Sequence, residues 1–191
     1  IEIPSTDGIL EPKSVAAVMD EEVAALMITN PNTLGIFEPH IQEICDIVHA
    51  KGGLVYCDGA NLNALLGKVQ LGKAGIDVMH FNLHKTFSTP NCGGGPGSGP
   101  VGIKKILEPF LPQPVIVKKD DQFDFDENRP QSIGRVKANF GNFGMLVRAF
   151  TYIRELGPEG LRKISEMAVL NANYIRRKLE KSNHLAFNRP S

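Results

Sequence analysis

The sequence predicts an α/β fold in which a mainly parallel sheet is flanked by helices. Three short apolar runs, at 23–28, 54–57 and 77–81, are typical of strands that are buried in a sheet. Residues of helical spacing separate the first two runs, and Gly52-Gly53 ends that predicted helix. Strands that alternate with helices indicate parallel pairing, because a parallel connection needs a crossover segment.

Polar residues gather where the predicted strands end. Thr29 and Asn30 follow the first run, Asp58 follows the second, and His84 and Lys85 come shortly after the third. In open α/β sheets, ligands bind outside the carboxyl ends of the strands. The three polar clusters therefore predict a binding site at one edge of the sheet.

Lys85 and Asp58 together predict a site for pyridoxal phosphate. A lysine can form an imine with the aldehyde of this cofactor, and an acid can keep the pyridine nitrogen protonated, which makes the ring an electron sink. Taken singly, a lysine is usually a solvated surface residue, and Asp-Gly after a strand is ordinary turn chemistry. The hydroxyl of Thr86 and the imidazole of His84 are of the chemical kind that binds phosphate.

Several polar residues leave two interpretations open. Asn30 belongs either to an ordinary turn or to a contact with the cofactor ring or the substrate. Arg135 and Arg148 are candidates for binding a carboxylate, although surface arginines are commoner. His80 and His84 are four residues apart but no HExxH motif is present, so we predict no metal site. Without a cofactor, His80 would be a core histidine.

The glycine-rich segment 93–102 formally contains GxGxxG but does not meet the requirements of a dinucleotide site. No strand immediately precedes the motif, and a β-like Val-Gly-Ile follows it instead of a helix. A loop that approaches an anion and a flexible surface loop both remain possible interpretations.

Cys45 and Cys57 are predicted to be buried and Cys92 to be accessible. With no CxxC spacing, the three cysteines predict a reducing cytoplasm.

The charge balance and the apolar runs of the chain argue against two classes of partner. Lys and Arg number 21, as do Asp and Glu, so no broad charge points to nucleic acid or to an anionic membrane. No apolar run approaches the roughly 20 residues that span a bilayer. The chain does not begin with Met, and we expect it to be part of a longer polypeptide.

Downstream, 120–127 is expected to be an acidic surface loop, and helices near 145–153 and 159–181 are expected to be separated at Gly157-Pro158.

Several segments carry a family resemblance that covers essentially the whole chain. On these segments the chain resembles the glycine-cleavage P-protein family, specifically the C-terminal part of its cofactor-carrying subunit 2. The resemblance implies a fold-type I enzyme, with 1–135 in the large cofactor domain and 136–191 leading into a truncated small domain. The segments are 29–35, 58–63, 77–90, 93–100, 141–144 and 170–174.

The resemblance also implies roles for individual residues. Lys85 would be the Schiff-base lysine, Asp58 the partner of the pyridine nitrogen, Ala60 a residue packed on the ring face, and His84 a neighbour of the phosphate or imine. The remaining residues expected in the cofactor site are Thr29, Asn30, Asn61 and Thr86. Asn91-Cys92 and Asn139 depart from the family pattern and are expected to weaken catalysis.

The implied reaction is decarboxylation of glycine, with transfer of the aminomethyl group to the lipoyl arm of the H-protein and release of CO2. The implied assembly is a homodimer of this subunit, paired with the companion subunit 1 of the P-protein in a heterotetramer. One rival is another fold-type I enzyme, such as an amino-acid decarboxylase or aminotransferase. A second rival is a catalytically silent scaffold.

Overall fold

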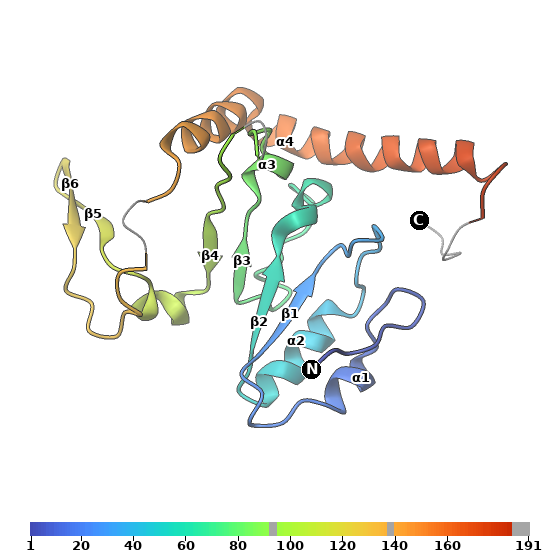
Figure 1. Cartoon of the computed structure of the whole chain (residues 1–191), viewed down its shortest axis with the longest axis horizontal. Coiled ribbons are helices and arrows are strands. Elements are labelled where there is room, and N and C mark those ends of the chain that lie inside the picture. Colours follow the sequence, from blue (N-terminus) through green and yellow to red (C-terminus); the bar gives the residue numbers. More distant parts are fainter. Residues whose placement is uncertain (92–94, 137–139, 185–191) are drawn as a thin grey trace.

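A four-stranded sheet forms the centre of the molecule. The structure is a computed structural model that describes residues 1–91, 95–136 and 140–184. The strand order is β1-β2-β3-β4, with β1, β2 and β3 parallel and β4 antiparallel to β3 (Figure 1). This topology confirms the predicted mainly parallel sheet. The strand bounds are β1 Ala25–Thr29, β2 Leu54–Asp58, β3 Val78–His80 and β4 Val101–Ile103.

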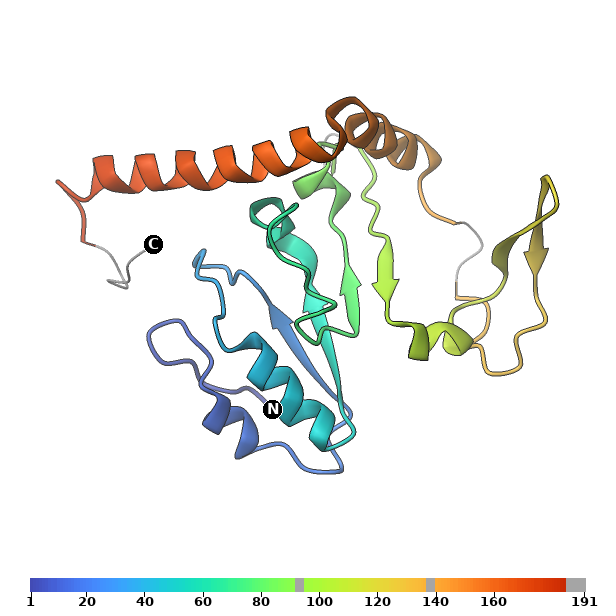
Figure 2. The same cartoon turned by 180° about the vertical axis from the view of Figure 1, so that it is seen from behind.

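Two helices, α1 (Pro12–Ala16) and α2 (Ile41–Ala50), lie together on one face of the sheet (Figure 2). The apolar positions of α2 recur every three to four residues, so one side of the helix is buried against the sheet. The buried residues of α2 are Ile41, Ile44, Cys45 and Val48, as the sequence predicts. Because side chains alternate along a strand, the inward residues of β2 are Val55 and Cys57, both fully buried.

The opposite end of the sheet, where β1, β2 and β3 finish, is built from short helices and one long helix. The short elements are η1 (Gly59–Ala64) after β2 and α3 (Leu83–Thr86) after β3, and they pack on each other. The long helix α4 (Phe143–Leu179) runs across these strand ends (Figure 1). The buried hydroxyl of Ser165 in α4 donates to the carbonyl of Asn63 at 2.8 Å, which fixes α4 on η1.

The expected break at Gly157-Pro158 is present as a kink inside α4. Gly157 has φ 61° and ψ −174°, a conformation that favours glycine. The helix resumes directly at Pro158, whose fixed φ suits the first turn of a helix. None of the described helices is both long enough and apolar enough to cross a membrane.

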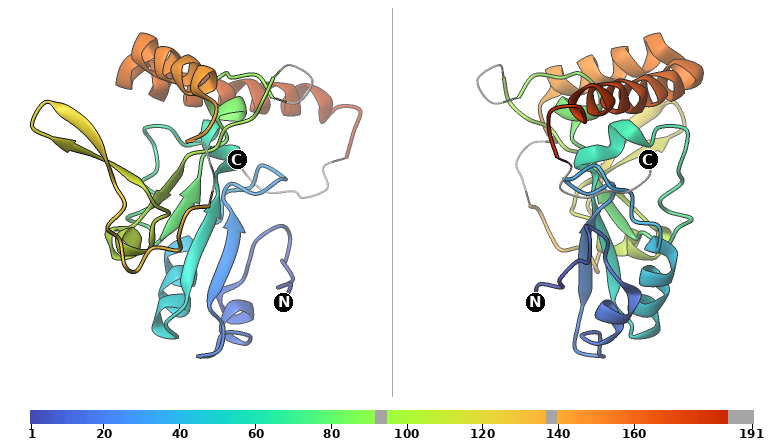
Figure 3. Two further views of the ribbon diagram at one scale, coloured as in Figure 1. Left: turned by 60° about the vertical axis from the view of Figure 1, so that its left-hand side comes forward. Right: turned by 90° about the vertical axis from the view of Figure 1, so that its right-hand side faces the viewer.

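The prediction of an acidic surface loop at 120–127 is wrong, because these residues form the turn and the second strand of a β-hairpin. Strand β5 (Val115–Lys119) pairs antiparallel with β6 (Gln122–Asp126), and the hairpin projects away from the main sheet (Figure 3). Phe123 and Phe125 alternate with acidic residues, which is a strand period of two. The ring of Phe125 also stacks on Phe140, with centroids 5.4 Å apart. The division into domains at 135 stays a prediction.

Candidate active site

Asp58 ends β2 with its carboxylate held on one side only. Its Oδ1 accepts a hydrogen bond from the backbone N–H of Ala60 at 2.8 Å and lies 3.2 Å from Nε2 of His80. His80 stands directly opposite Asp58 in the β2–β3 register. Among the described residues, Oδ2 of Asp58 has no protein partner, and the side chain is 29% exposed. This second oxygen is therefore left for a ligand.

Tyr56 completes a chain of three side chains on the same face of the sheet. Its hydroxyl lies 2.8 Å from Nδ1 of His80, and the two ring centroids are 5.8 Å apart. Tyr56 and Asp58 are two residues apart in β2, so both point away from the core that Val55 and Cys57 line. His80 is therefore half-buried, with a hydrogen bond at Nδ1 and the Asp58 carboxylate beside Nε2.

Gly59 allows η1 to approach β3 closely. An added Cβ at Gly59 would lie 2.0 Å from the carbonyl oxygen of His80 and 2.9 Å from Cε of Met79. Residue 59, which lies between Asp58 and Ala60, therefore has no room for a side chain.

We expect Gly59→Ala to destabilise the protein by about 1–3 kcal/mol, the usual cost of overpacking a tight site. The backbone carbonyl cannot move aside as a flexible side chain can. Denaturant unfolding of the full-length protein measures the change. Gly72→Ala is the matched control, since nothing lies within 4 Å of its added Cβ. Equal stability losses in the two variants would contradict the close approach.

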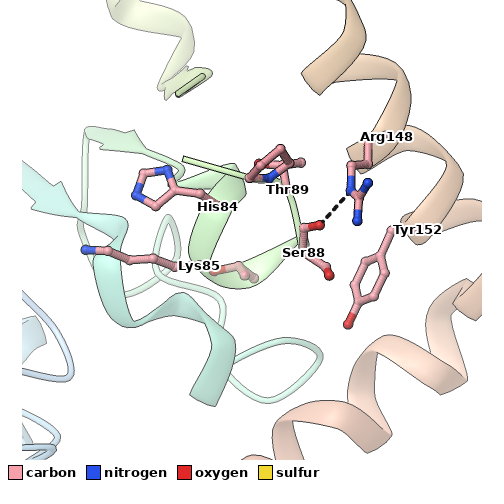
Figure 4. Close-up of a pocket in the computed structure, with 8 residues that line it drawn as sticks. His84, Lys85, Ser88, Thr89, Arg148 and Tyr152 are labelled. Carbon is pink, nitrogen blue, oxygen red and sulfur yellow. Dashed lines mark hydrogen bonds between the residues drawn. The ribbon is translucent and has the colours of Figure 1, made fainter. Parts of the chain in front are cut away.

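Lys85 is the third residue of α3, which begins directly after the two-residue loop that leaves β3. The helix is held by Leu83, which is buried in the core, while Lys85 itself is exposed. In Figure 4, Lys85 and His84 project from one side of α3, and Arg148 and Tyr152 lie on the other. An open pocket of about 700 Å³ surrounds α3 and the turn after it. Its lining residues are His84, Lys85, Thr86, Ser88, Thr89, Pro90, Arg148 and Tyr152.

Four buried polar atoms close to Lys85 in sequence have no hydrogen-bond partner among the described residues. They are Oδ1 of Asn82, Nδ1 of His84, Oγ1 of Thr86 and Oγ1 of Thr89. Buried polar groups are almost always paired, because leaving one unpaired costs free energy. The four atoms lie on either side of Lys85 in sequence and are free to pair with a ligand or with water.

Arg148 and Arg135 are separated by the structure, and neither is directed at the Lys85 amine. Nε of Arg148 donates to the carbonyl oxygen of Ser88 at 2.9 Å (Figure 4). Ser88 has a positive φ of 56°. The hydrogen bond from Arg148 to Ser88 joins α4 to the turn after α3. Arg135 is exposed, pairs with Glu127 at 2.6 Å and does not line the pocket.

Asn30 and Asn61 brace the loop after β1. Oδ1 of Asn30 accepts from the backbone N–H of Glu38 at 3.0 Å, and Asn30 is only 1% exposed. Nδ2 of Asn61 donates to the carbonyl oxygens of Pro31 at 2.9 Å and Asn32 at 3.1 Å. These bonds brace the loop, while the buried Nδ2 of Asn30 has no partner among the described residues. The assignment of Asn30 and Asn61 to the cofactor site stays a prediction. Thr29 pairs with Asp58 across β1 and β2, as expected for neighbouring strand ends.

Cys45 and Cys57 are fully buried, as predicted. Burial raises the pKa of Cys45 to about 11 and also raises the pKa of Cys57, so both thiols stay protonated at neutral pH. Cys92 and Asn139 lie outside the described residues, as do Gly93 and Gly94. In the part of the chain that is described, no three His, Cys, Asp or Glu side chains group as they would around a metal ion.

Comparison with known sequences shows the family to which the chain belongs. A sequence model described as aminotransferase class-V matches residues 2–115, and the chain belongs to this family. Two curated relatives share more of the sequence, and each is called "Probable glycine dehydrogenase (decarboxylating) subunit 2". The relative from Bacillus licheniformis is 60% identical over 97% of this chain, and that from Listeria innocua is 59% identical over 94%.

Solved structures agree with this assignment at the level of the fold. A glycine decarboxylase (P-protein) of the glycine cleavage system, in inhibitor-bound form, has a TM-score of 0.65 and 24% identity over 84% of this chain and 38% of its own. A cysteine desulfurase from Thermococcus onnurineus NA1 has a TM-score of 0.65 and 20% identity over 94% and 44%. The predicted fold class and the family resemblance are confirmed. The chain spans 38% and 37% of the two curated relatives.

Proposed function

We propose that the complete protein decarboxylates glycine with pyridoxal phosphate and passes the aminomethyl group to the lipoyl arm of a carrier protein. The observation that carries the proposal is the position of Asp58 at the end of β2, directly before η1, and of Lys85 on α3, which packs on η1. The 60% identity to a relative named as a glycine dehydrogenase subunit supports glycine as the substrate.

The residues present fit the cofactor. Its aldehyde needs an amine, which Lys85 supplies from the exposed side of α3, and its ring nitrogen needs an acceptor, which is Oδ2 of Asp58. Its phosphate needs donors, and the unpaired groups of His84, Thr86 and Thr89 are of that kind. Ala60 would pack on the ring face. When bound, the cofactor supplies an electron sink for the pair left behind as CO2 departs.

The side chains of this protein would do three things in that reaction. The charge of Asp58 would hold the proton on the ring nitrogen, which keeps the ring electron-withdrawing. The amine of Lys85 would hold the cofactor at rest and would be free to move a proton when the substrate amine takes its place. The imidazole of His84, beside it on α3, is a second group able to hold a proton.

The partners follow from the same proposal. We propose a homodimer of this subunit that works with a companion subunit 1 and with a lipoylated H-protein in the cytoplasm. The relatives named as "subunit 2" support a second kind of subunit. Phe123, Phe125 and Phe143 are exposed in this chain, which leaves apolar surface for other parts of the protein or its partners.

Exchange of labelled CO2 with the carboxyl group of glycine tests the function. The full-length protein with its companion subunit should exchange CO2 with glycine, and adding a lipoylated carrier should increase the rate because the carrier accepts the aminomethyl group. Exchange that does not respond to the carrier would indicate a simple decarboxylase. Amino transfer to a keto acid in place of exchange would indicate an aminotransferase.

A further inference from the structure

We infer that His80 is a positioning residue that orients Asp58, and that Tyr56 in turn fixes His80. The inference rests on the proposed function, in which Asp58 accepts a hydrogen bond from the protonated ring nitrogen of the cofactor. The three side chains form one line of contacts: the Tyr56 hydroxyl to Nδ1 of His80 at 2.8 Å, and Nε2 of His80 to Oδ1 of Asp58 at 3.2 Å.

The contacts assign a tautomer to His80. An ionised carboxylate only accepts hydrogen bonds, so Nε2 of His80 must carry the proton that faces Asp58. In a neutral imidazole the other nitrogen is then an acceptor, and Nδ1 accepts from the hydroxyl of Tyr56. Burial, with a smaller effect from the charge of Asp58, raises the pKa of Tyr56, so its hydroxyl keeps the proton that it donates.

The direction of the two donors determines which carboxylate oxygen stays available. His80 and the backbone N–H of Ala60 both contact Oδ1 of Asp58. The carboxylate cannot rotate about its Cβ–Cγ bond without losing both contacts, and Oδ2 is left without a protein partner among the described residues. His80 therefore presents one oxygen of Asp58 to the cofactor and holds the other. An imidazole that orients another group through its second nitrogen is a common supporting arrangement.

The register of the sheet supplies this arrangement. Asp58 and His80 are partners across β2 and β3, and Tyr56 is two residues before Asp58 on the same face. The backbone thus fixes the starting points of all three side chains, so the line of contacts depends little on loops. The side chains of Asp58 and His80 are 29% and 22% exposed, so water only partly screens the contact between them.

Titration of the cofactor-free full-length protein with pyridoxal phosphate, followed by visible absorbance, tests the role. His80→Leu should weaken cofactor binding roughly tenfold, because the N–H donor to a charged group is lost. It should also shift the absorbance maximum of the bound cofactor, because the acceptor of its ring proton is no longer held. Tyr56→Phe removes one hydroxyl, is the milder change for folding, and should shift both readings in the same direction. His80→Gln should restore part of the binding, since its amide supplies an N–H.

His49→Gln is the matched control. His49 also donates from Nε2 to a carboxylate, that of Asp77 at 2.7 Å, but at the start of β3 and away from the site. It should leave the absorbance maximum unchanged. Wild-type binding and spectrum in both His80→Leu and Tyr56→Phe would overturn the inference, as would the same spectral shift in His49→Gln. Failure of the wild type itself to bind the cofactor would instead overturn the proposed function.

Discussion

Replacing Lys85 by Ala in the full-length protein should abolish covalent attachment of pyridoxal phosphate and lower glycine decarboxylation on the order of a thousandfold or more. Lys85 is the lysine that α3 presents beside the unpaired polar groups of His84 and Thr86. Without its amine, the cofactor aldehyde has no covalent partner in the site. The variant should still fold, because the Lys85 side chain is exposed and forms no contact in the core.

Borohydride reduction followed by peptide mass analysis measures the covalent bond directly. In the wild type, the reduced cofactor should be found on the peptide that contains Lys85, and in Lys85→Ala the adduct should be absent. Lys73→Ala is a suitable control, since Lys73 is also an exposed lysine but lies outside the pocket. A cofactor adduct of undiminished amount in Lys85→Ala would show that another residue holds the cofactor.

The sheet and its polar end could be predicted because buried parallel strands have a simple sequence pattern. The runs 23–28 and 54–57 are almost wholly apolar, and polar turn residues follow each of them. The hairpin at 115–126 was not predicted, because the five acidic residues of 120–127 outweighed the alternation of Phe123 and Phe125. Alternation alone indicates a strand, whatever the polar residues between the apolar ones are.

The contacts around Asp58 could not be predicted, because they depend on how two strands align. Only the register that places His80 opposite Asp58 brings Tyr56, His80 and Asp58 into line. Likewise, the sequence left Asn30 open between a turn and a ligand contact, and it could not show which backbone groups Asn61 reaches. The structure shows their amides bonded to backbone groups of the loop after β1. A polar residue at a strand end can support the wall of a site as readily as it can bind a ligand.

Asp77, at the opposite end of β3 from the site, should be one of the most costly residues to replace. It is 4% exposed. Its Oδ2 accepts from His49 at 2.7 Å and from the backbone N–H of Val55 at 2.8 Å, and its Oδ1 lies 3.1 Å from Nζ of Lys104. These groups hold the start of β3 against β2 and the segment after β4. The sequence showed this aspartate only as the first residue of an apolar run.

We expect Asp77→Asn to lower the free energy of unfolding by about 2–4 kcal/mol. The loss follows because Lys104 would keep its charge with no carboxylate beside it. The range lies below the roughly 3–5 kcal/mol of a fully buried pair, because the Lys104 and His49 side chains are 34% and 33% exposed and water screens them. Denaturant unfolding of the full-length protein measures the change. Asp124→Asn is the control, since Asp124 pairs with Lys119 on the exposed hairpin and its loss should have no measurable effect.

The same aspartate should make the stability of the protein sensitive to acid. Burial alone would raise the pKa of Asp77, but the hydrogen bonds from His49, Val55 and Lys104 lower it below its usual value of 3.8. The unfolded chain then binds this proton more readily than the folded one, so stability rises with pH through this range. The contribution is complete above the unfolded value, near pH 4, and is lost as the pH falls through the folded pKa. Asp77→Asn has no such proton to bind, so its stability should fall less steeply below pH 4 than that of the wild type. Parallel acid curves would mean that the carboxylate of Asp77 is not held as its contacts indicate.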